Sequence, residues 1–163
     1  MPIAIVQRNK SITSLLNGAN DALKQVVPVQ HKISKPQLMK ELLVVQFGVF
    51  IGITGDIKGK LVLEAGQQTF GIIGEKMFGS KISDDMLGSF SGELGNMLAG
   101  NITTNINHHG MAIDITTPTV IERKAKISGY ELAIYLKSSL ENIGDLNIYL
   151  LLNEHENNTK NGL

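Results

Sequence analysis

Hydrophobic residues recur with helical spacing in three segments of the chain. The first runs over residues 13–27 and predicts an amphipathic helix, with Ser11 or Thr13 as its N-cap and Pro28 ending it. A shorter segment over residues 67–78 has the same spacing and is followed by a glycine. Both segments are therefore expected to form helices that bury one face.

The third helical segment is the longest and is predicted over residues 83–105. Ser83 is a suitable N-cap, and Asp84 and Asp85 follow in the first turn, where the helix dipole favours negative charge. The helix is expected to end before the His-His-Gly sequence at residues 108–110.

Other segments show the composition or the alternation of β-strands. A short turn separates the first two of these segments, residues 42–54 and 60–64, and predicts a hairpin. The last two, residues 130–140 and 146–153, alternate regularly between apolar and polar residues. Residues 29–40 are polar and contain a proline, so they are expected to form a loop or edge structure. Helices followed by runs of strands indicate an α+β fold: an antiparallel sheet of about five strands, with the helices on one face. The strand segments are residues 42–54, 60–64, 111–123, 130–140 and 146–153.

Composition excludes several classes of protein. With 163 residues, of which 42% are hydrophobic, the chain is long enough and apolar enough for one domain with a real core. Fifteen basic residues balance fifteen acidic ones, so the basic surplus of a nucleic-acid binder is missing. Cysteine is absent, which excludes disulfides, thiolate metal ligands and a cysteine nucleophile. No apolar run approaches the ~18 residues that a membrane span needs, so we expect a cytoplasmic protein without membrane insertion.

The long helix contains an unusual number of glycines. Each glycine inside a helix costs about 1 kcal/mol relative to alanine, so four cost about 3–4 kcal/mol. A helix that keeps them needs a reason, such as close packing or close approach of a partner. They are Gly88, Gly92, Gly95 and Gly100.

The apolar residues of this helix lie on one side, and a polar stripe lies on the other. Projection at 100° per residue places Ser89, Gly92, Glu93, Asn96 and Gly100 within about 50° of a common line. Two of these side chains, an acid and an amide, are three residues apart and project together. The stripe is either ordinary solvated helix surface or a docking face with polar chemistry at its centre.

The sequence gives little support for a metal site, a phosphate-binding loop or a nucleophilic serine. His108 and His109 are adjacent and would point apart in any regular structure, so a polar loop explains them better than a metal site. Gly59-Lys60 in the hairpin lacks the serine or threonine and the first glycine of a phosphate-binding loop. No serine lies in the pattern of a hydrolase nucleophile.

The polar stripe resembles a specific signature. Ser89-x3-Glu93-x2-Asn96, with twenty-one residues between Asn96 and Pro118, is similar to the motif of the chemotaxis phosphatase family that includes CheC, CheX and FliY. The flanking sequences at residues 92–101 and 115–121 look most like the CheX branch. The order of predicted elements is also similar over nearly the whole chain, so the resemblance implies a single CheX-like phosphatase domain at residues 1–155 and a flexible tail at 156–163.

The resemblance implies a substrate and roles for the motif residues. The substrate would be the aspartyl phosphate of a phosphorylated CheY-like receiver domain. Asn96 would orient the attacking water, and Glu93 would form a salt bridge to the lysine of the receiver. Gly92, Gly95 and Gly100 would allow the close approach of the receiver, while Ser89 and Pro118 would support the placement of the helix.

Cofactors and partners follow from the same resemblance. The protein would need no cofactor of its own, because Mg²⁺ is expected on the receiver. A homodimer assembled by edge strands is expected. The alternative is a non-catalytic docking module for a receiver domain or a flagellar-switch partner, and a metabolite sensor has no sequence feature behind it.

Only one active helix is expected in each chain. CheC-like members carry two such motifs, and the first helix here offers Thr13-x3-Asn17-x2-Asn20, with an asparagine where the acid should be. Leu42 stands where the matching proline would fall. The second site is therefore predicted to be absent, as in CheX-type proteins.

Overall fold

The computed structural model describes residues 2–153, with the side chains of residue 10 and of residues 12–153. The predicted tail at 156–163 and the end of the predicted domain at residue 155 lie outside the described residues.

Helices and strands alternate in blocks along the described residues, as expected for an α+β fold. The helical elements are α1 (Pro2–Val26), α2 (Gln67–Phe78), the 3₁₀ turn η1 (Asp84–Met86) and α3 (Leu87–His108). The strands are β1 (His31–Ile33), β2 (Gln37–Met39), β3 (Leu43–Val45), β4 (Gly48–Gly55), β5 (Gly59–Glu64), β6 (Ile113–Ile115), β7 (Thr119–Ile121), β8 (Ala125–Ile127), β9 (Leu132–Leu140) and β10 (Gly144–Leu152).

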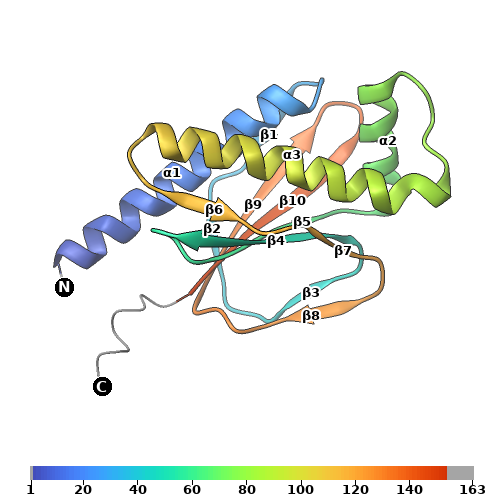
Figure 1. Cartoon of the computed structure of the whole chain (residues 1–163). Coiled ribbons are helices and arrows are strands. Elements are labelled where there is room, and N and C mark those ends of the chain that lie inside the picture. Colours follow the sequence, from blue (N-terminus) through green and yellow to red (C-terminus); the bar gives the residue numbers. More distant parts are fainter. Residues whose placement is uncertain (1, 154–163) are drawn as a thin grey trace.

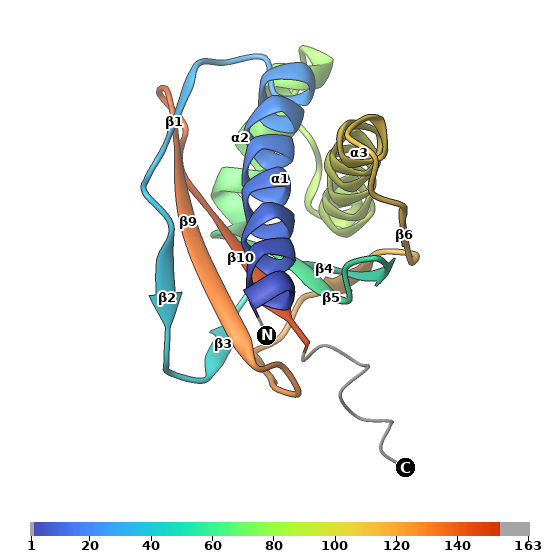
Figure 2. The ribbon, with the colours of Figure 1, turned by 90° about the vertical axis from the view of Figure 1, so that its left-hand side faces the viewer.

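The main sheet is antiparallel and has the strand order β1-β9-β10-β5-β4-β6. At one edge β2 also pairs with β9, and at the other β7 also pairs with β4. All three helices cover one face of this sheet, and the small β3–β8 ribbon lies on the opposite face (Figures 1 and 2). The α+β class with helices on one face is therefore confirmed.

Alternating side chains of the central strands enter two separate cores. On β5, Leu61 and Leu63 belong to the core beneath the helices, whereas Val62 belongs to the smaller core beneath the β3–β8 ribbon. On β10, Leu150 and Leu151 divide in the same way. Because both faces are covered here, these strands are almost continuously hydrophobic.

The structure contains more strands than the five predicted, because two predicted strands are interrupted, residues 29–40 form two edge strands, and β8 lies outside every predicted strand. Residues 42–54 divide into β3, which joins the ribbon, and β4, which joins the main sheet. Residues 111–123 divide into β6 and β7 around Thr116–Pro118. A proline cannot donate a hydrogen bond to a neighbouring strand, which is consistent with this break at an edge. Residues 29–40 contain the edge strands β1 and β2.

The helix boundaries differ from the prediction at the beginnings of α1 and α3, and α3 also continues past its predicted end at residue 105, through His108. α1 begins at Pro2 instead of residue 13, and a proline is compatible with the first helical turn, whose N–H groups lack helical acceptors. Ser83 precedes a 3₁₀ turn and makes no side-chain cap hydrogen bond, so its predicted capping role was wrong. The end of α2 was predicted correctly, because Gly79 closes it in the left-handed region (φ 79°) and donates its N–H to the carbonyl of Glu75 at 2.8 Å.

Candidate functional site

The helix α3 buries its apolar side and exposes the polar stripe. Leu94 and Leu98 are buried in the main core, where α3 packs against α1, α2 and the edge of the sheet formed by β4, β6 and β7. Glu93 and Asn96 lie on the opposite side and are exposed. The predicted orientation of the helix is therefore confirmed.

The glycines of α3 do not all serve the exposed stripe. A Cβ on Gly95 would lie 2.8 Å from Cγ1 of Val49, so Gly95 packs α3 onto its own sheet. A Cβ on Gly92 would lie 3.2 Å from Cγ2 of Val120 on β7. Around Gly100 a Cβ would have no neighbour within 4 Å. The expectation that Gly95 helps a partner to approach is corrected, because this residue is buried.

The segment between β6 and β7 lies opposite the polar stripe and is anchored to β4. The amide of Thr116 donates to the carbonyl of Gly52 at 3.0 Å, and its Oγ1 accepts a hydrogen bond from the amide of Gly52 at 2.9 Å. A Cβ on Gly52 would lie 3.0 Å from the side chain of Thr116, so a glycine is needed for this contact. Pro118 follows in the same segment and is half-buried.

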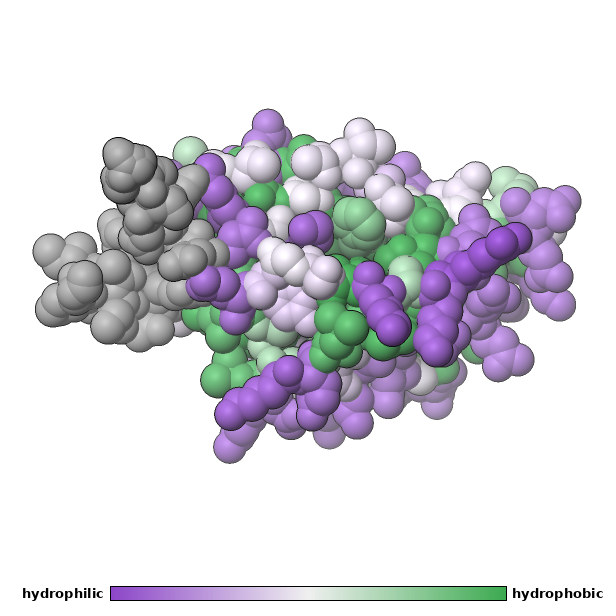
Figure 3. All heavy atoms as spheres, turned by 90° about the horizontal axis from the view of Figure 1, so that it is seen from below, coloured by the Kyte–Doolittle hydropathy of each residue, from purple (hydrophilic) through white to green (hydrophobic). Residues whose placement is uncertain are grey.

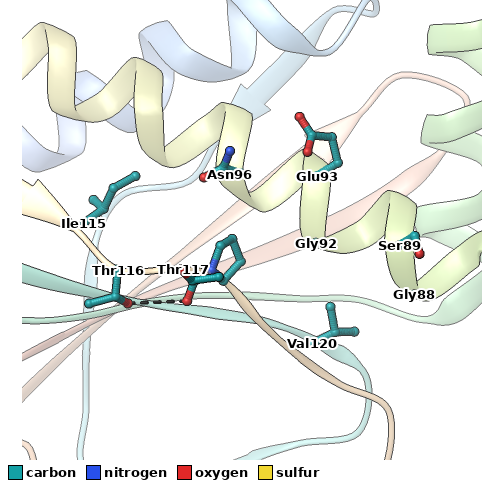
Figure 4. Close-up of a pocket in the computed structure, with 10 residues that line it drawn as sticks. Gly88, Ser89, Gly92, Glu93, Asn96, Ile115, Thr116, Thr117 and Val120 are labelled. Carbon is teal, nitrogen blue, oxygen red and sulfur yellow. Dashed lines mark hydrogen bonds between the residues drawn. The ribbon is translucent and has the colours of Figure 1, made fainter.

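Helix α3 and the segment from Ile115 to Val120 border an open groove of about 500 Å³ (Figure 4). Five of the predicted site residues meet there: Ser89, Gly92, Glu93, Asn96 and Pro118. Gly95 and Gly100 do not line it. The remaining lining residues are Gly88, Ile115, Thr116, Thr117 and Val120.

The loop that forms one wall of the groove was not predicted. Residues 111–123 were expected to form one strand, in which Thr116 and Thr117 would be ordinary strand residues. The signal that could have found them is the Thr-Thr-Pro sequence, because proline inside a strand pattern indicates an interruption.

The side chains of Glu93 and Asn96 are available to a partner. Among the described residues, neither makes a hydrogen bond or an ion pair within the chain. Glu93 is the only charged residue that lines the groove. The groove therefore offers one negative charge, which attracts a cation, and one neutral amide, which can donate and accept hydrogen bonds.

Two of the described histidines, His31 and His109, make contacts within the chain. Nδ1 of His109 lies 2.8 Å from the carbonyl of Asn105, and Nε2 of His31 lies 2.8 Å from Oδ1 of Asn20. In the part of the chain that the structure describes, no three His, Asp or Glu side chains are grouped closely enough to hold a metal ion. No helix in that part is both long and apolar enough to cross a bilayer.

Comparisons with known proteins agree with the motif. The family described as "Chemotaxis phosphatase CheX" matches residues 47–132, more than half of the chain. The "CheY-P phosphatase CheX" of Thermotoga maritima is 29% identical over 144 residues, covering 85% of this chain and 93% of that protein.

Solved structures share the fold. The CheX chain in the CheX-CheY-BeF3-Mg²⁺ complex from Borrelia burgdorferi has a TM-score of 0.72 and 22% identity, covering 88% of this chain and 97% of that chain. A CheC-like superfamily protein from Shewanella sp. PV-4 has a TM-score of 0.72 and 25% identity, with 88% and 97% covered. Considering the sequence match, the fold and the arrangement of Glu93 and Asn96 together, the chain belongs to the chemotaxis phosphatase CheX family.

Proposed function

We propose that this protein is a phosphatase that hydrolyses the aspartyl phosphate of a phosphorylated CheY-like receiver domain. The observation that carries the proposal is the pair Glu93 and Asn96, exposed side by side on α3 at an open groove and without a hydrogen bond or ion pair to the other described residues. Membership of the CheX family and the phosphatase name of the Thermotoga relative support the same reaction.

Asn96 is proposed to orient the attacking water. In the reaction, the oxygen of water forms a bond to phosphorus while the bond between phosphorus and the aspartate oxygen breaks, which releases inorganic phosphate and a carboxylate. Transfer of a phosphoryl group depends mainly on positioning and on charge stabilisation. The amide of Asn96 can accept a hydrogen bond from the water and donate another, and it adds no negative charge that would repel the phosphate.

Glu93 is proposed to fix the position of the receiver by a salt bridge to its lysine. The carboxylate lies one helical turn before Asn96 on the same face, so an ion pair there would hold α3 at one register relative to the phosphate. Mg²⁺ is proposed to bind to the receiver, because the Borrelia complex of CheX and CheY contains Mg²⁺ and BeF3. It would neutralise charge on the phosphoryl group.

The test follows the decay of a phosphorylated receiver with the wild-type protein and two variants. Asn96→Ala should lower turnover by about 100-fold or more while binding is kept, because the water loses its orientation. Glu93→Ala should mainly weaken association. Equal turnover by the wild type and Asn96→Ala would contradict the assigned role.

The alternative function is a docking module that binds a receiver or a flagellar-switch partner without catalysis. The same assay separates the two functions. Binding of the receiver by the wild-type protein without faster loss of phosphate would favour the docking module.

We also propose a homodimer, formed through the edge of the sheet at β2 and the adjoining β3. Within the described residues β2 pairs only with β9, and large hydrophobic side chains are exposed on β2, on β3 and in the segment between them. Hydrophobic area is visible among hydrophilic side chains on the face opposite the helices (Figure 3).

Sedimentation of the wild type and of Leu38→Lys tests this interface: the variant should shift toward monomer, and an unchanged dimer would place the contact elsewhere. The exposed residues are Leu38, Leu42 and Val44.

A further inference from the structure

The groove has two walls, and the proposed reaction uses only one of them. Glu93 and Asn96 project from α3, whereas the opposite wall is the segment around Thr116 and Thr117 (Figure 4). A receiver element that reaches Asn96 through the groove must pass along this second wall.

In the second wall, Thr116 is bonded to the sheet and Thr117 is exposed to the groove. Thr116 is bonded to Gly52 through both its amide and its hydroxyl oxygen, at 3.0 and 2.9 Å. Its hydroxyl also donates a long hydrogen bond of 3.4 Å to the carbonyl of Thr117 (Figure 4). The residue before Thr117 is therefore anchored to the sheet, and the carbonyl of Thr117 is bonded to it.

Thr117 itself has unused hydrogen-bonding groups. Its residue is exposed and lines the groove. Within the described part of the chain, neither its hydroxyl nor its amide N–H has a hydrogen-bond partner. Pro118 follows and can offer no amide N–H. Thr117 thus supplies the free donors of this wall, which are held in place before any partner arrives.

We propose that Thr117 is a further recognition residue: its hydroxyl and amide hydrogen-bond to a polar main-chain segment of the receiver domain that enters the groove opposite Asn96. This inference rests on the proposed phosphatase function. A carbonyl-rich loop fits the site, because the wall offers donors, and Glu93 across the groove disfavours a negatively charged side chain. Since Thr117 contributes binding and not water orientation, its loss should raise KM and leave kcat unchanged.

The experiment measures dephosphorylation of the receiver, and binding of the receiver charged with beryllofluoride and Mg²⁺, for three variants. Thr117→Val removes the hydroxyl at almost constant shape and should raise KM and Kd about three- to tenfold with unchanged kcat. Thr117→Ser should restore wild-type values. Thr119→Val is the matched control: Thr119 is an exposed threonine on β7 whose neighbour Val120 faces the groove, so its own side chain points to the other face of the strand.

Two results would overturn the inference, and they differ from each other. If Thr117→Val matches the wild type in Kd and KM while Asn96→Ala is inactive, the phosphatase function stands and the role of Thr117 is wrong. If the wild-type protein neither binds nor dephosphorylates receivers, both proposals fail. A loss of kcat in Thr117→Val with unchanged KM would also contradict a recognition role.

Discussion

The helices α1 and α3 lie side by side and carry similarly spaced polar motifs, but the two motifs differ in what their side chains bond to. On α3, Glu93 and Asn96 are exposed and make no hydrogen bond or ion pair with the other described residues. On α1, the equivalent of Asn96 is Asn20, which is already bonded to His31. The comparison shows that spacing alone does not make a site: the side chains must also be unpaired and border a space that a partner can enter.

A neighbouring residue of α1 is also used within the chain. The amide of Asn105 near the end of α3 donates to a carboxylate oxygen of Asp21 at 3.0 Å. Polar groups of α1 therefore help to join the helices, whereas those in the middle of α3 are left for a partner.

A lysine at the matched positions 93 and 17 should give the largest difference between the two helices. Glu93→Lys places a positive charge where the proposed function needs an acid for the receiver lysine, so KM and Kd for the receiver should rise about 30-fold or more. Asn17→Lys changes the matched position of α1 and should leave both constants unchanged. Titration of each variant with a receiver charged with beryllofluoride measures this, and equal effects would remove the functional distinction between the helices.

Alanine in place of one buried glycine on each helix should separate the two helices by stability. At Gly95 the new Cβ would meet the side chain of Val49, so we expect Gly95→Ala to lower the free energy of unfolding by about 1–2 kcal/mol despite its better helix propensity. At Gly18 on α1, the nearest atom is Cγ2 of Ile102 at 3.4 Å, an ordinary contact. Gly18→Ala should therefore raise the free energy of unfolding by up to about 1 kcal/mol.

Urea unfolding of both variants tests this pair. A stabilised Gly95→Ala protein would mean that α3 can move away from the sheet at little cost. It would also weaken the interpretation that this glycine serves packing.

The smallest expected effect concerns the contact between Asn20 and His31. Burial, followed by the positive charge of Lys24, lowers the pKa of His31 below its usual value of 6.5. The folded protein therefore binds fewer protons here than the unfolded chain, so this contribution to stability is complete above pH ~6.5 and is lost as the pH falls further, through the lowered pKa of the folded state. Tm should decrease slightly more between pH ~7.5 and ~5 in the wild type than in His31→Gln. An equal decrease in both proteins would show that another group titrates.

The helical parts of the fold could be predicted well from the sequence. The hydrophobic repeat located α2 and the body of α3, and the face that α3 buries was predicted from the same repeat. These features depend on local spacing, which a sequence displays directly. The beginning of α1 was missed because no hydrophobic repeat was recognised before residue 13.

The sheet and the groove could be predicted only in part. Two apparent strands contain breaks, and whether β3 continues in the main sheet or leaves it depends on pairing with β8, which lies some eighty residues away. The loop at Thr116–Pro118 belongs to the groove because Thr116 is hydrogen-bonded to Gly52 on β4, and no local sequence pattern shows that contact.

The sequence by itself determined which residues α3 exposes, since a helix places an acid and an amide three residues apart on one face wherever the helix lies. The tertiary structure decided that a second wall stands opposite them, that Gly95 faces inward, and that Asn20 is already occupied. Those outcomes depend on contacts between segments distant along the chain, which pairing and packing establish only when the sheet and helices come together.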